Sequence, residues 1–82
     1  MTYTDYMNWA KEYRDQVEVL ERKLEKRKGK QHFKTPDDRR VFESTTRILY
    51  EMRLDCIKTA AVLEKKAFSI REDEQYAEDS IA

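Results

Sequence analysis

The chain has 82 residues, 41% of them charged, and its 17 Lys and Arg residues balance its 17 Asp and Glu residues. A chain of this length forms one domain at most, here residues 1–82, and its single cysteine, Cys56, excludes an internal disulfide. No apolar run is long enough to span a membrane, and the first ten residues lack the basic and apolar segments of a secretory signal. These features predict a soluble cytoplasmic protein.

The first predicted helix covers residues 3–29. Its apolar residues alternate in steps of three and four, which places them on one stripe of a helix, as in the seam of a coiled coil. They are Tyr3, Tyr6, Ala10, Tyr13, Val17, Leu20 and Leu24. Thr2 is a suitable N-cap with Asp5 in the first turn, and Gly29 is a natural end because glycine adopts the left-handed conformation readily.

The second predicted helix covers residues 36–68. Thr35 is a suitable N-cap, and Pro36 suits the first helical position. The seam of this helix again alternates in steps of three and four: Phe42, Thr45, Leu49, Met52, Cys56, Thr59 and Leu63. A connection of roughly five to seven residues makes two helices antiparallel neighbours. The sequence therefore predicts an all-α fold, an antiparallel helical hairpin.

The antiparallel pairing sets bulky side chains against small ones, which favours dense packing. The bulky residues of the first helix are Tyr3, Tyr6, Trp9 and Tyr13. The small residues opposite them are Cys56, Thr59, Ala60 and Ala67. Trp9 is accordingly predicted to lie in the core.

A second apolar stripe, here called the rear stripe, follows the back of the second helix: Tyr50, Leu54, Ile57, Ala61 and Phe68. The first helix covers only one face of the second, so something else must cover this stripe. The favoured interpretation is a homodimer, a four-helix bundle in which the rear stripe is the protein interface. Alternatively, residues 70–82 fold back as a short third helix that starts at the S-x-x-E box of Ser69 and Glu72, or they form a flexible acidic tail.

Basic residues gather around the connection between the helices, called here the basic tip: Lys26, Arg27, Lys28, Lys30, Lys34, Arg39 and Arg40. Such a cluster is a candidate polyanion-binding site. The neutral chain and the intervening acidic residues Glu25, Asp37 and Asp38 favour a solvated turn instead. The tip and the acidic C-terminal segment lie at opposite ends of one hairpin, so they can pair only between antiparallel copies.

No catalytic, metal-binding or cofactor-binding motif stands out. Glu18, Glu21 and Glu25 share a helix face suited to a divalent cation, but their spacing from arginines favours ion pairs on a solvent face. The sequence thus predicts a small non-enzymatic interaction or scaffold protein, without a cofactor, that binds itself and an unidentified protein. The alternative function is that of a nucleic-acid-binding accessory or regulatory protein that uses the basic tip.

Overall fold

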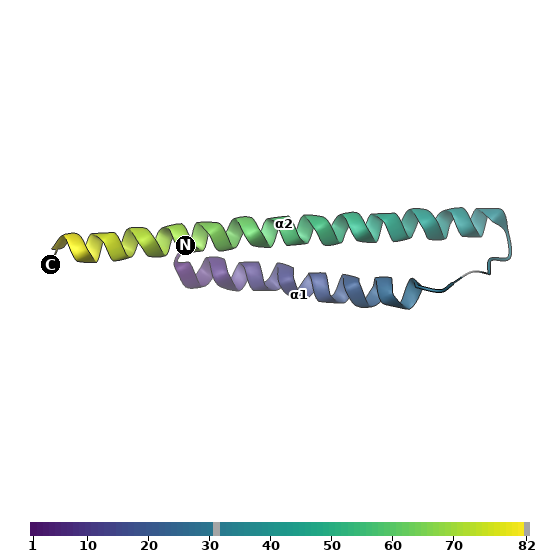
Figure 1. The fold of residues 1–82 in the computed structure, drawn as a ribbon, viewed down its shortest axis with the longest axis horizontal. Helices are drawn as coiled ribbons and strands as arrows, with labels where there is room; N and C mark the ends of the chain where they lie inside the picture. The colour runs from purple at the N-terminus through teal and green to yellow at the C-terminus, as the bar shows by residue number, and fades with distance from the viewer. Residues whose placement is uncertain (31, 82) are drawn as a thin grey trace.

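The computed structural model describes the backbone of residues 1–30 and 32–81 and the side chains of residues 1–30 and 32–73. Two long helices, α1 (Tyr3–Arg27) and α2 (Pro36–Ile81), lie side by side and antiparallel (Figure 1). The molecule is 71 Å long and only 16 by 15 Å across. No strand occurs in the described part of the chain. The all-α class is therefore confirmed, and the arrangement agrees with the predicted hairpin.

Both helices begin at the predicted caps. The Thr2 hydroxyl accepts from the Asp5 N–H at 3.3 Å, and the Asp5 carboxylate accepts from the Thr2 N–H at 2.9 Å. These hydrogen bonds, the one from the Thr2 backbone foremost, hold the pKa of Asp5 below its ordinary value. At α2, the Thr35 hydroxyl accepts from the Asp38 N–H at 3.1 Å.

The end of α1 lies two residues before the predicted one. The last helical residue is Arg27, and the N–H of Lys28 donates to the Glu25 carbonyl at 3.2 Å. Gly29 has a φ of +82°, the left-handed conformation that closes a helix without steric cost only for glycine. Gly29 therefore closes α1, although it lies two residues after the last helical residue.

The predicted end of the second helix is wrong. Instead of stopping at residue 68, α2 continues without a break through Ser69 to Ile81. No glycine or proline follows Pro36, and good helix formers dominate this region, so the expected S-x-x-E start lies inside a continuous helix. The chain after Phe68 therefore does not fold back; it projects roughly 20 Å beyond Tyr3 at 1.5 Å per residue (Figure 1).

The core is a narrow seam between the helices. Its buried residues are Ala10, Val17, Leu20 and Leu24 of α1 and Cys56, Ala60, Leu63 and Ala67 of α2. Ala10 packs on Ala60 and Leu63, and the rings of Tyr6 and Tyr13 pack around this contact. The predicted match of bulky tyrosines with small residues is therefore present, and it lets the helix axes approach closely.

Two residues assigned to the core lie outside it. Trp9 is 42% exposed and Met52 is 48% exposed. The seam of α2 passes through Arg53 and Ala60 rather than through Met52 and Thr59, and the carboxylate of Glu21 on α1 binds Arg53 at 2.9 Å. A long arginine stem can cover apolar surface while its charged end stays in water, so an apolar pattern alone misses such a position.

Candidate protein-interaction surfaces

The two edges of the seam differ in chemistry. On one edge, Arg14 forms an ion pair with Glu64, and Arg53 forms one with Glu21. On the opposite edge, the Gln16 side-chain oxygen accepts a 3.6 Å hydrogen bond from the Cys56 thiol. Trp9 precedes Gln16 by seven residues and so lies on that second edge. The first edge is called here the charged edge and the second the tryptophan edge.

The rear stripe lies beside the charged edge, and its members differ in exposure. Tyr50 is 50% exposed, Leu54 49% and Phe68 49%. Ala61 is also exposed, whereas Ile57 is half-buried and packs against the core cluster of Val17, Leu20 and Cys56. The Phe68 ring lies 6.0 Å from the Tyr3 ring, at an interplanar angle of 56°. Ile57 and Phe68 thus contribute to the hairpin as well as to the stripe.

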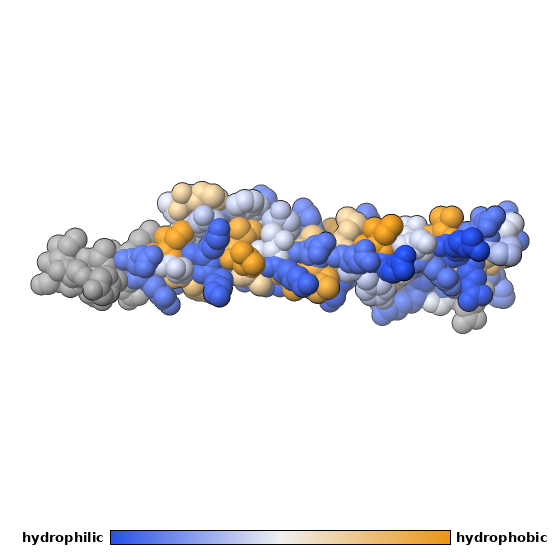
Figure 2. Space-filling model, turned by 90° about the horizontal axis from the view of Figure 1, so that it is seen from above, coloured by the Kyte–Doolittle hydropathy of each residue, from blue (hydrophilic) through white to orange (hydrophobic). Residues whose placement is uncertain are grey.

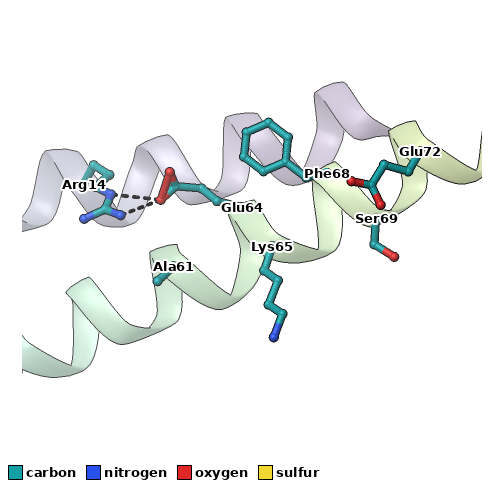
Figure 3. A pocket seen from close by; sticks show the side chains of 7 residues that line it. All are labelled: Arg14, Ala61, Glu64, Lys65, Phe68, Ser69 and Glu72. Carbon is teal, nitrogen blue, oxygen red and sulfur yellow. Dashed lines mark hydrogen bonds and ion pairs between the residues drawn. The ribbon is translucent and has the colours of Figure 1, made fainter. Parts of the chain in front are cut away.

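An open groove follows the C-terminal part of the rear stripe (Figure 3). Its lining includes Ala61, Glu64, Lys65 and Phe68. In the figure Phe68 points toward α1, whereas Lys65 points away from it. The groove is open to solvent, and Ala61 is its smallest lining residue. Ala61 and Ser69 are the short side chains of its lining, which also includes Arg14 and Glu72.

Further apolar side chains are exposed on the other flank of α2, among them Met52, which the sequence pattern placed in the seam. Val41, Ile48, Met52 and Val62 are all exposed there. Their separations are sums of steps of three and four residues, but Asp55 falls at one position of this pattern before Val62, and Lys66 at the next position after it. Seen from the α2 side, apolar groups alternate with charged ones along the described part of the molecule (Figure 2). These charges interrupt the apolar periodicity, so the sequence does not indicate an apolar stripe on this flank.

The basic tip is partly packed. The rings of Phe33 and Phe42 lie 5.2 Å apart, and the Arg27 guanidinium lies 5.0 Å from the centre of the Phe42 ring. Lys30 lies 5.6 Å from the first ring and 5.3 Å from the second. Arg27 also donates to the Thr46 hydroxyl at 3.2 Å. Arg27 and Lys30 therefore lie over an aromatic pair, and Lys30 remains exposed to solvent.

The other basic residues of the tip divide into two groups. Lys28 binds Glu25 at 2.9 Å, and this hydrogen bond raises the pKa of Lys28. Arg39 binds Glu43 at 3.0 Å. Lys26, Lys34 and Arg40 are exposed, and they form no ion pair with the residues whose side chains the structure describes. Three residues of the candidate polyanion-binding set therefore have neither an ion pair nor an aromatic contact among the described side chains.

The carboxylates considered for a metal ion are engaged separately. Glu18 faces Arg22 at 3.7 Å, Glu21 binds Arg53 and Glu25 binds Lys28. Among the described side chains, no group of three or more His, Cys, Asp or Glu residues is arranged to hold a metal ion. Among the residues that the structure describes, neither helix has a stretch long and apolar enough to cross a membrane.

The architecture places the chain among all-α proteins built from two long antiparallel helices. The chain matches no protein-family model, and it has no significant match among curated proteins or solved structures. The exposed surfaces of α2 and of the tip are therefore the basis of the functional argument.

Proposed function

We propose that this chain is a non-enzymatic helical interaction protein that self-associates through α2 as a homodimer. The observation that carries the proposal is the row of large apolar side chains exposed along α2, among them Tyr50, Leu54 and Phe68. Exposed apolar side chains arranged along one helix are typical of a surface that binds another protein. In a dimer of hairpins, α2 lies at the centre of a four-helix bundle and α1 covers it from outside.

The size of the core supports the same proposal. A hairpin of two helices has a single contact seam, and chains of this length bury too little apolar surface to be more than marginally stable alone. A second copy covers the apolar flank of α2 and adds the missing burial. The dimer then offers its remaining surfaces, including the tip, to further protein partners as a scaffold.

The test is the molar mass of the wild-type chain and of a Leu54→Glu variant, measured by sedimentation over a series of concentrations. The wild type should approach twice the 10.0 kDa of one chain. Leu54→Glu should shift the equilibrium to monomer, because burial of an unpaired carboxylate costs several kcal/mol. Leu54 is half-exposed in the hairpin, so this variant should still fold.

Val62→Glu is the matched control, since Val62 is exposed on the other flank of α2. It should leave the mass of the dimer unchanged. A wild-type chain that remains a monomer at every concentration would contradict the proposal. A dimer that Leu54→Glu does not weaken would show that the chain associates through another surface.

Nucleic-acid binding is the second candidate function, and the exposed Lys26, Lys34 and Arg40 favour it. Phosphate contacts release counterions, so the logarithm of the binding constant should fall linearly as the logarithm of the salt concentration rises. Binding of a random RNA or DNA duplex should therefore weaken steeply with salt and be lost when all three residues are replaced by Gln. Absence of binding at low salt would eliminate this function.

A further inference from the structure

The rear stripe continues a regular pattern beyond its apolar residues. Steps of three and four residues connect Arg47, Tyr50, Leu54, Ile57, Ala61 and Glu64. Positions with this spacing share one side of a helix and form the seam when two helices pack as a coiled coil. This span has a positive charge at one end, a negative charge at the other and apolar residues between them. The same spacing continues to Glu43 and Arg40 on one side and to Phe68 and Arg71 on the other.

We infer that a second copy of this chain binds the stripe with its own stripe, α2 against α2 and antiparallel, an inference that rests on the proposed self-association. The two-fold axis passes between the levels of residues 55 and 56. Leu54 then faces Ile57 of the second copy. By the two-fold symmetry, Ile57 faces Leu54 of the second copy. Further from the axis, Tyr50 faces Ala61, and Arg47 faces Glu64.

The sizes of the facing side chains fit this arrangement. Tyr50 is half-exposed and is the largest member of the pattern, whereas Ala61 is the smallest and lines the groove of Figure 3. We call the space over Ala61 the hollow. The ring of Tyr50 from the second copy enters this hollow, as a knob enters a hole between helices. Since each copy has one ring and one hollow, the two contacts form together.

The charges of Arg47 and Glu64 also fit the antiparallel pairing. Both hydrogen bonds from Arg14 to Glu64 end on the same carboxylate oxygen, Oε1. The other oxygen, Oε2, accepts no hydrogen bond from the described residues, and Arg47 forms no ion pair with them. Arg47 of the second copy can therefore bind Glu64 without displacing Arg14.

Other registers bring unfavourable contacts. A shift by one heptad in one direction sets Glu64 against Leu54 and Arg47 against Arg71. The opposite shift sets Arg47 against Ile57. A parallel pair in register sets Arg47 against Arg47 and Glu64 against Glu64. Between residues 47 and 64, facing like charges, or a charge against an apolar side chain, disfavour these pairings, so Arg47 and Glu64 favour the antiparallel register. Outside this span the same register sets Phe68 against Glu43 and Arg71 against Arg40.

Charge reversal tests the inference. Arg47→Glu alone sets two pairs of glutamates face to face, and it should raise the dissociation constant of the dimer by about tenfold or more at low salt. Glu64→Arg alone sets two pairs of arginines face to face and should weaken the dimer similarly. A mixture of the two variants should form heterodimers as strong as the wild-type dimer, because both facing pairs become Glu with Arg. Lys66→Glu, the same charge change on an exposed residue outside the pattern, should have no effect.

The outcomes separate this inference from the proposed function. A wild-type monomer overturns both. A wild-type dimer that Arg47→Glu does not weaken overturns the interface alone, and weakened variants that fail to combine in the mixture overturn the register.

Glu64→Arg also removes the contact with Arg14, so a cysteine cross-link provides an independent measurement. In a Cys56→Ala background, Tyr50→Cys chains mixed with Ala61→Cys chains should form a disulfide dimer on mild oxidation. Met52→Cys should not cross-link to Ala61→Cys, because Met52 lies on the other flank. Equal cross-linking of the two mixtures would overturn the inference.

Discussion

Replacement of Phe42 by Ala should destabilise the hairpin by about 2–3 kcal/mol, although Phe42 lies at the tip and far from the central seam. The ring is half-buried, and half of the burial of a phenylalanine contributes about 1 kcal/mol. The contact with Phe33 at 5.2 Å contributes about 0.5–1 kcal/mol. Arg27 and Lys30, at 5.0 and 5.3 Å from the ring, add about 0.5 kcal/mol each.

Two control variants separate these contributions. Phe42→Leu keeps most of the apolar area but loses the aromatic face, so it should cost about half as much as Phe42→Ala. Lys34→Gln changes a tip residue that is exposed and without an ion pair among the described side chains, and it should cost almost nothing.

The assay is denaturant unfolding followed by far-ultraviolet circular dichroism. All variants should be compared at one protein concentration, since association with a second copy contributes to apparent stability. If Phe42→Ala costs less than about 0.5 kcal/mol, the tip is a solvated turn and the aromatic cluster does not stabilise it.

Two further predictions concern the helix caps. Thr35→Ala should cost about 1 kcal/mol by loss of the hydroxyl that accepts from the Asp38 N–H, and an unchanged unfolding midpoint would show that this cap is dispensable. The pKa of Asp5 lies below its ordinary value, so its contribution to stability is present above the unfolded-state pKa and is lost as pH falls through the folded-state pKa. Thr2→Ala removes the hydroxyl but keeps the backbone donor, so the carboxyl titration followed by NMR should move part of the way back to the ordinary value. A titration that does not move would contradict the capping-box account.

The sequence predicted the local features of the fold well where one residue type has one strong preference. Thr2, Thr35 and Gly29 perform the capping roles expected of them. The alternating apolar residues of α1 also lie in the seam as predicted, because a regular apolar pattern has one compatible face.

The end of α2 could not be predicted from local signals. Ser69 and Glu72 have the spacing of a capping box, but a serine also occurs inside helices when its neighbours favour helix strongly. A helix start requires the preceding chain to leave the helix, and nothing between Pro36 and Ser69 breaks it. The capping pattern was therefore insufficient evidence for a third helix.

The candidate surfaces were predicted in outline, but their contacts were not. Glu18 faces Arg22 of its own helix, as its spacing from arginines suggested, but Arg14 pairs with Glu64, fifty residues away. Arg53, a charged residue, occupies a seam position because its partner Glu21 comes from the other helix. Such contacts depend on how two helices align, which the periodicity of either helix alone does not specify.

The antiparallel contact between two copies of α2 can be tested by one distance measured between copies. A spin label on Arg40→Cys, in a Cys56→Ala background, marks the exposed start of α2 in each chain. In the inferred register, Arg40 of one copy lies at the level of Arg71 of the other, so pulsed electron paramagnetic resonance should give a distance of about 45–50 Å at 1.5 Å per residue. A distance of about 20–25 Å would place both labels at the same level and show a parallel pair, and absence of any distance between copies would show that the chains do not associate.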